Sequence, residues 1–237
     1  MSYSWTEGLL NLLFPPACML CKKRLDVDGK RYALCYSCGK SFHPAGWFCI
    51  SCGLSLGDSG VCGCGSATKN LSAVFALSRF EERWRSVIHS FKYFGRKHLG
   101  ESLGRLIGDG IIESGVAAEI DMVTAVPLHP EREKERGYNQ SELMAYSVAG
   151  ALGLPHARML SRHRNTVSQI SLSGRERREN MRGAFICKSD IDSLKKRRIL
   201  LVDDVYTTGA TMREAGRVLA DAGAAKVTGA VAAFQQR

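Results

Sequence analysis

The sequence predicts an α/β protein with a central parallel sheet flanked by helices, preceded by a small cysteine-rich module. Strand-like and helix-like segments alternate between residues 72 and 234, which is typical of a parallel sheet with helices on both faces. One fully apolar run, 199–202, ends in two adjacent carboxylates and a Thr/Gly loop. Eight of the nine cysteines lie before residue 65. Ligands of such sheets bind beyond the carboxyl ends of the strands, so the residues that follow each strand are candidates.

Size and composition fit a globular protein of one domain plus a small module. The 237 residues are 45% hydrophobic and 24% charged. No apolar run reaches 18 residues, and the apolar N-terminus lacks a basic segment and a cleavage site. We therefore expect no membrane span, no signal peptide and a cytoplasmic protein. The formal net charge of +10 favours polyanionic partners such as phosphates or nucleic acid, although it is also compatible with plain solubility.

The N-terminal cysteines form four closely spaced pairs: Cys18 and Cys21, Cys35 and Cys38, Cys49 and Cys52, Cys62 and Cys64. Two residues between cysteines let one turn offer both sulfurs to a single tetrahedral Zn²⁺. Eight thiolates make two closed structural sites, paired most simply in sequential order, with an interleaved pairing left open. Four disulfides are the alternative, which the missing export signal disfavours. Cys187 stands alone in an apolar stretch and is expected to be a small core residue.

Apolar patterning places the elements of the larger part. Strands are predicted over 72–80, 122–126, 158–160, 199–202 and 226–234. Helices are predicted over 82–93, 97–115, 141–152 and 213–222, the first with Trp84, Val87, Ile88 and Phe91 inward. Residues 63–70 are predicted to be a linker. Residues 162–181 are polar, basic and without period, which predicts a long mobile loop. The strand ends at Val126 and Val202 are expected to face one crevice.

The candidate phosphate site follows the strand 199–202. Asp203 and Asp204 can accept hydrogen bonds from vicinal hydroxyls or bind Mg²⁺. The loop that comes next leads into a helix N-terminus, and its residues are Thr207, Thr208, Gly209, Ala210 and Thr211. Loop amides and the helix dipole suit a phosphate monoester, so the combination predicts a ribose 5-phosphate site. The alternative is a plain strand-to-helix turn whose acids cap the helix. A Walker loop is excluded, because no Gly-Lys-Ser/Thr follows.

Two further segments could bind anions. In the first, Pro127, Leu128 and His129 precede a run in which Arg132, Lys134 and Arg136 alternate with glutamates. If this run is extended, the three cations share one face and could bind pyrophosphate; the alternative is a solvated loop. The second segment, 164–180, contains Arg164, Gln169 and Arg175. It could close over an anionic substrate, or it could be a disordered segment or a nucleic-acid grip.

Taken together, these motifs resemble the ComF family, in which a double zinc ribbon is joined to a type I phosphoribosyltransferase domain. The matching stretches are the eight cysteines, residues 91–100, residues 126–140, the segment 166–180 and residues 200–211. The resemblance implies a zinc-ribbon module at 1–68 and a transferase domain of type I phosphoribosyltransferase fold at 69–237. It also implies binding of phosphoribosyl pyrophosphate (PRPP) and Mg²⁺.

The resemblance assigns a role to each stretch. Asp203 and Asp204 would bind the ribose hydroxyls, directly or through Mg²⁺, and residues 207–211 would hold the 5′-phosphate. Residues 127–136 would be the pyrophosphate loop and 164–180 a flexible hood, while Lys92 could reach the pyrophosphate. Thr207 departs from purine-salvage relatives, which carry an aspartate there, so purine salvage is disfavoured.

Two functions follow from this resemblance. One is phosphoribosyl transfer to an unknown acceptor during natural competence or the use of external DNA. The alternative is a non-catalytic competence accessory protein that senses PRPP or a nucleotide and binds single-stranded DNA. A competence helicase is then a possible partner.

Overall fold

The computed structural model describes residues 16–25, 32–57, 62, 64, 71–164, 174–189 and 194–235. The chain divides into two compact units, residues 1–43 and 44–237. Within the described residues, no helix combines the length and the apolar character that a membrane crossing requires.

The described part of the first unit is a closed turn and a short helix that carry four cysteines. A backbone bridge joins Ala17 to Arg24, and the Cys18 N–H donates to the Lys23 carbonyl at 2.7 Å. The second element is helix α2 (Tyr36–Lys40), which starts directly after Cys35 and contains Cys38. Both elements therefore present sulfur atoms from short backbone turns.

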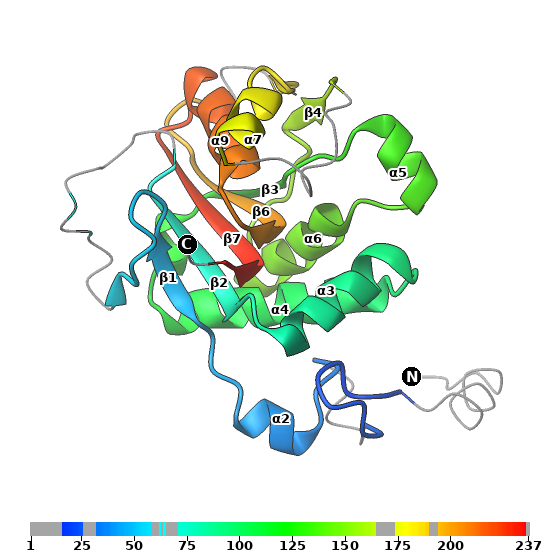
Figure 1. The fold of residues 1–237 in the computed structure, drawn as a ribbon. Helices are drawn as coiled ribbons and strands as arrows, with labels where there is room; N and C mark the ends of the chain where they lie inside the picture. Colours follow the sequence, from blue (N-terminus) through cyan, green and yellow to red (C-terminus); the bar gives the residue numbers. More distant parts are fainter. Residues whose placement is uncertain are drawn as a thin grey trace. The chain divides into compact units, whose positions relative to one another are not determined.

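The second unit is built on a five-stranded sheet (Figure 1). Its order is β1 (Gly46–Cys49), β2 (Ala73–Arg79), β7 (Lys226–Phe234), β6 (Arg198–Tyr206) and β3 (Met122–Ala125). The last four strands are mutually parallel, which confirms the predicted parallel sheet. Strand β1 pairs antiparallel with β2 and was not predicted, because it lies inside the cysteine-rich segment. Strand β6 is longer than expected, since its pairing with β7 continues to Tyr206.

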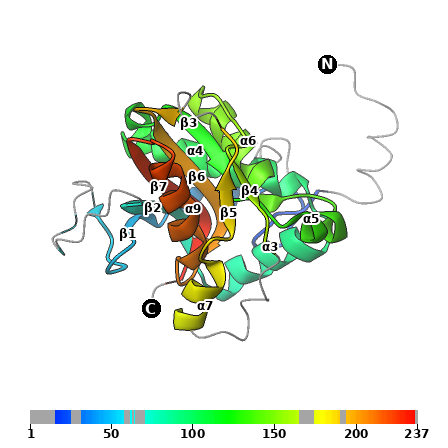
Figure 2. The same ribbon diagram turned by 90° about the horizontal axis from the view of Figure 1, so that it is seen from above.

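Helices cover both faces of this sheet (Figure 2). Helices α4 (His98–Glu113) and α6 (Gln140–Leu152) pack on one face, and α9 (Ala210–Asp221) packs on the other. Helices α4 and α6 approach closely because a glycine faces the contact. A Cβ atom on Gly104 would lie 2.5 Å from the Met144 carbonyl oxygen. Helix α3 (Glu82–Tyr93) buries the four side chains predicted to point inward.

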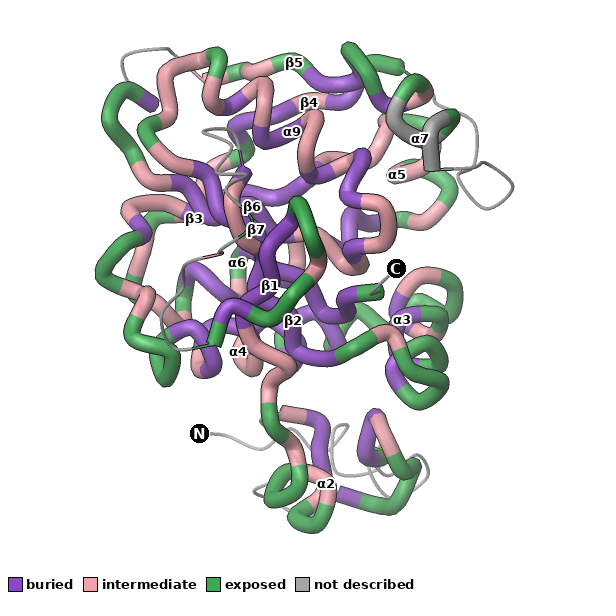
Figure 3. Tube along the Cα trace, turned by 60° about the vertical axis from the view of Figure 1, so that its left-hand side comes forward, coloured by how far each residue is buried: buried purple, intermediate pink, exposed green. Residues whose placement is uncertain are grey.

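One hydrophobic core fills the space between the sheet and α9. It joins Val74 of β2, Leu201 of β6 and Val231 of β7 to Met212 of α9, and it includes Phe48 of β1. Figure 3 shows these strands as mostly buried along their length. Cys187, predicted to be a core residue, is partly buried against this cluster. Short elements complete the unit: η3 (Ala117–Glu119), and a separate sheet of β4 (Leu160–Arg162) and β5 (Phe185–Cys187).

The charged run that could have been extended is a helix, α5 (Pro130–Arg136). Proline occupies the first turn, where no backbone donor is needed, and the His129 side chain accepts a hydrogen bond from the Glu131 N–H. Gly137 ends the helix in the left-handed conformation, at φ 78°. In a helix, residues four apart share a face and residues two apart do not. The expectation that all three cations lie on one face is therefore wrong.

The predicted mobile loop 162–181 also contains regular structure. Arg162 ends β4, and residues Gly174–Met181 form helix α7, which contacts α9. The expectation of a loop is therefore wrong at both ends of the segment, where polar, basic residues form regular structure. Gln169 lies outside the described residues, and Arg175 lies in α7. The guanidinium of Arg164 donates to the Arg182 carbonyl at 2.8 Å.

Candidate functional site

A pocket of about 470 Å³ lies where β3 and β6 end. The two strand ends are held together, because the Val126 N–H donates to the Val202 carbonyl at 2.9 Å. Residues that follow β3 line the pocket together with Asp203 and Asp204, which were predicted to follow the strand 199–202 and instead lie inside the longer strand β6. The predicted residues that line it are Pro127, Leu128, Arg132, Arg136, Asp203, Asp204, Thr207 and Thr211. Thr208, Gly209 and Ala210 connect Thr207 to Thr211.

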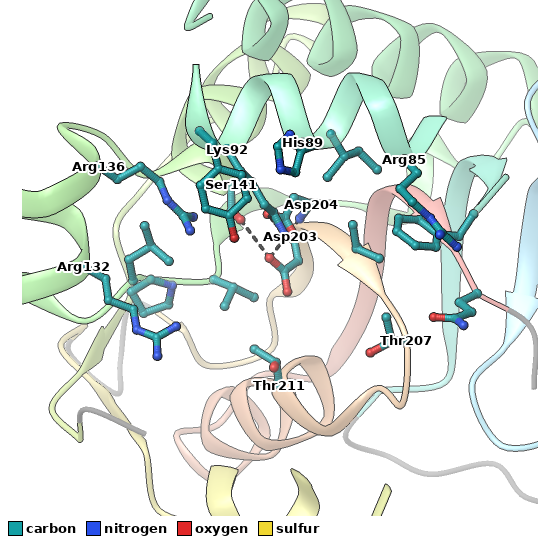
Figure 4. A pocket seen from close by; sticks show the side chains of 18 of the residues that line it. Arg85, His89, Lys92, Arg132, Arg136, Ser141, Asp203, Asp204, Thr207 and Thr211 are labelled. Carbon is teal, nitrogen blue, oxygen red and sulfur yellow. Dashed lines mark hydrogen bonds and ion pairs between the residues drawn. The ribbon is translucent and has the colours of Figure 1, made fainter. Parts of the chain in front are cut away.

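Asp203 and Asp204 form the centre of this pocket (Figure 4). The Ser141 hydroxyl donates to Asp203 Oδ1 at 2.8 Å, and the Asp204 N–H donates to the same oxygen at 2.9 Å. Lys92 Nζ lies 2.7 Å from Asp204 Oδ2, and the Asp204 side chain is 14% exposed. Burial raises the pKa of Asp203 to about 7, and the charge of Asp204 also raises it, whereas the Ser141 hydrogen bond lowers it. The pair therefore favours a ligand that supplies a cation or hydroxyl donors.

The turn after β6 leads directly into α9. Gly209 is the N-cap residue of α9 and has φ 72°, a conformation that favours glycine. A Cβ atom there would lie 2.1 Å from Tyr206 Oη, so space also requires glycine. Thr208 Oγ1 accepts from the Ala210 N–H at 3.3 Å. The result is a short turn at a helix N-terminus, beside two carboxylates and open to the pocket, which suits a phosphate group.

Cationic side chains stand on both sides of the aspartates. Figure 4 shows Arg132 and Arg136 on one side, and Arg85 beside Thr207 on the other. Arg132 and Arg136 reach the pocket together because they are one helical turn apart on α5. Lys134 is exposed on that helix. His129, the N-cap residue of α5, fixes where this helix begins.

Several pocket residues were not predicted. Ser141 is the second residue of α6, and the Asn139 side chain that caps this helix also donates to the Val126 carbonyl at 3.1 Å. Helix α3 contributes Arg85 and His89, and the guanidinium of Arg85 lies 5.3 Å from the centre of the Phe80 ring. The start of α6 was predicted to within one residue, since the predicted helix is 141–152. No local signal could have placed Ser141 beside an aspartate 62 residues away.

The cysteines form two groups of four, in sequential order. One group is Cys18, Cys21, Cys35 and Cys38, and the other is Cys49, Cys52, Cys62 and Cys64. In each group the sulfur atoms all lie within 4.8 Å of one another. Sulfurs that share a tetrahedral zinc ion at about 2.3 Å should be separated by about 3.8 Å. The separations include 3.5 Å between Cys21 and Cys35, and 3.8 Å between Cys49 and Cys64. Both groups fit zinc.

Comparison with known proteins agrees with this architecture. Residues 9–65 match the double zinc ribbon domain, and residues 139–237 match the phosphoribosyl transferase domain. The chain is therefore a zinc-ribbon protein with a type I phosphoribosyltransferase domain. This pairing of domains, and relatives that are named for competence and DNA utilisation, make the chain similar to the ComF family.

Three relatives illustrate this similarity. The DNA utilization protein YhgH of Salmonella typhi is 28% identical over 222 residues, which cover 91% of this chain and 96% of that protein. Competence protein F of Haemophilus influenzae is 27% identical over 217 residues, covering 89% and 93%. Competence protein ComFC of Streptococcus pneumoniae is 36% identical over 102 residues, or 43% of each chain.

Proposed function

We propose that the pocket at the end of β6 binds PRPP together with Mg²⁺, and that the protein transfers the phosphoribosyl group to an acceptor. One observation carries the proposal: the paired aspartates, the turn into α9 and two arginines of α5 line one pocket. Each part suits a different part of PRPP. The carboxylates suit the ribose diol, the turn suits the 5′-phosphate, and the arginines suit the pyrophosphate.

The carboxylates of Asp203 and Asp204 would hold Mg²⁺, since hard oxygen ligands are those that this ion prefers. Bound Mg²⁺ would neutralise part of the pyrophosphate charge. Arg132 and Arg136 add positive charge on that side, and Lys92 can move from Asp204 to the pyrophosphate. The carboxylates near the sugar favour the positive charge that develops at C1′ as the bond to pyrophosphate breaks. The acceptor nucleophile then forms the new bond to C1′.

The other side of the pocket is suited to the acceptor. There, Arg85 stacks over Phe80, and Thr207 and Gln235 add hydrogen-bonding groups. A flat aromatic surface with a cation over it favours a planar, electron-rich acceptor such as a base or nucleotide. The names of the relatives, which refer to competence and DNA utilisation, support an acceptor of this chemical class, because DNA carries such bases.

Titration calorimetry with PRPP and Mg²⁺ tests the binding. The zinc-replete wild type should show saturable binding, and Asp204→Asn should weaken it about tenfold or more, because a charge-assisted contact is lost. Asp221→Asn is the matched control, since this acid lies at the far end of α9 and is exposed. It should bind as the wild type does. Absence of saturable PRPP binding by the wild type would reject the proposal.

The second candidate function is PRPP or nucleotide sensing by a DNA-binding accessory protein. The net charge of +10 and the zinc ribbons favour it. The two functions are separated by following pyrophosphate release with a panel of bases, nucleotides and single-stranded DNA. Saturable PRPP binding without release under any acceptor would assign the sensing function. DNA binding through phosphates should weaken steeply as salt increases.

A further inference from the structure

The second cysteine group is continuous with the sheet that carries residues 207–211, the proposed binding site of the 5′-phosphate, which we call the phosphate turn. Its first ligand, Cys49, is the last residue of β1, which pairs with β2 along its whole length. Beyond Cys49 the chain turns back at once. The Cys49 N–H donates to the Leu54 carbonyl at 2.9 Å, and the Gly53 N–H donates to the Cys49 carbonyl at 2.8 Å. Cys52 lies in this turn, so a metal bound here fixes its geometry.

The carbonyl of Ile50, between these two ligands, contacts both ends of the phosphate turn. Tyr206, the residue before Thr207, donates its hydroxyl to this carbonyl at 3.4 Å. Arg213, in the first turn of α9, donates a guanidinium N–H to the same carbonyl. Ile50 itself is buried. One backbone oxygen of the cysteine turn therefore accepts from the residue that precedes the phosphate turn and from a residue that follows it.

Aromatic packing fixes the same connection. The Phe48 ring of β1 stacks on Phe234 at 4.4 Å between centroids, and Tyr206 stacks on Phe234 at 5.0 Å. Both pairs are near parallel, with interplanar angles of 8° and 16°. The Tyr206 ring in turn occupies the space where a Cβ atom of Gly209 would lie. Tyr206 thus contacts both the turn that contains Ile50 and Gly209, the N-cap residue of α9, so a shift of this turn would displace Gly209.

We propose that zinc bound by Cys49, Cys52, Cys62 and Cys64 positions the phosphate turn by holding the Ile50 carbonyl in place. The other cysteine group belongs to the first compact unit, and the proposal assigns it no part in holding the Ile50 carbonyl. The two zinc sites therefore differ in their effect on the pocket. Loss of the zinc ion from the second site should make residues 207–211, the proposed 5′-phosphate site, less ordered. The choice of PRPP as a probe rests on the proposed function, whereas the exchange measurement described next does not.

A matched pair of substitutions tests the inequality. Cys52→Ser and Cys21→Ser each remove one exposed ligand from one group of four. The measurements are zinc content by elemental mass spectrometry and hydrogen exchange of the backbone amides of residues 207–212. Each variant should lose one zinc ion, and only Cys52→Ser should exchange faster at 207–212, by about tenfold, the effect of one lost hydrogen bond. PRPP affinity should fall in parallel.

A second pair avoids the zinc ligands in case Cys52→Ser does not fold. Arg213→Met removes one donor to Ile50, and Arg217→Met removes an exposed guanidinium one turn further along α9. Both should keep two zinc ions, and only Arg213→Met should exchange faster at 207–212. Two outcomes would overturn the inference. One is that the amides of residues 207–212 exchange at the same rate in both arginine variants. The other is that they exchange at the wild-type rate in Cys52→Ser that has lost its zinc ion. If the wild type binds no PRPP, the proposed function fails, while the exchange comparison still decides this inference.

Discussion

Substitution of Gly209 by alanine measures how tightly the phosphate turn is packed. Two costs are expected. The left-handed backbone at φ 72° costs an alanine about 1–2 kcal/mol. The new methyl group would also lie 2.1 Å from Tyr206 Oη and 2.4 Å from Cζ of that ring. The ring cannot swing aside freely, because it stacks on Phe234 and its hydroxyl donates to Ile50.

Relief of this overlap should cost a further 1–3 kcal/mol or so, the usual effect of overpacking. Gly153→Ala is the matched control, because Gly153 ends α6 at φ 66° and has nothing within 4 Å of its Cβ position. Urea unfolding should give a loss of about 1–2 kcal/mol for Gly153→Ala and about 2–5 kcal/mol for Gly209→Ala. PRPP affinity should fall only in Gly209→Ala. Equal losses of stability in the two variants would refute the packing argument.

Two other predictions concern stability. The Arg198 side chain and its backbone N–H lower the pKa of Asp121 to about 2, so Asp121→Asn should lose about 1 kcal/mol at neutral pH after allowance for solvent exposure. The carboxylate has the lower pKa when the protein is folded, so the difference in stability between the wild type and Asp121→Asn is complete above about pH 4 and shrinks as the pH falls towards 2. Urea unfolding at a series of pH values measures this difference. A difference in stability that grows on acidification contradicts the prediction. Gly104→Ala should destabilise the protein by about 1–3 kcal/mol, because its new methyl group would lie 2.5 Å from the Met144 carbonyl oxygen. Gly150→Ala should stabilise the protein by about 0.5–1 kcal/mol, because this glycine lies in helix α6 with nothing within 4 Å of its Cβ position. Thermal melts of the two variants should move in opposite directions, and shifts of the same sign would contradict the assignment of the contact.

The parts of the fold that sequence predicted well are those with strong local patterns. The run 199–202 is apolar on every residue, and helix α3 has its buried residues at helical spacing, so each could be placed by itself. The same is true of the turn 207–211, which was predicted to lead into a helix and does lead into α9.

The errors have two physical origins. In α5, the alternation of charges suggested an extended segment, although Pro130 and Gly137 are a helix start and a helix end. Strand β1 is only four residues long and depends on pairing with β2 rather than on its own pattern. Ser141 and Arg85 reach the pocket through the packing of helices, which no single segment encodes.

The antiparallel strand β1 also determines where a fragment that contains the intact sheet can begin. It covers the outer edge of β2, and at the opposite edge the backbone of Val123 bonds to Pro155 and Ala157. A fragment that begins at residue 69 would leave the outer edge of β2 unpaired and remove Phe48 from its place against Phe234. Unpaired strand edges template self-association. Expression of the second unit alone should therefore start no later than Pro44, so that the edge strand is retained and the fragment does not aggregate.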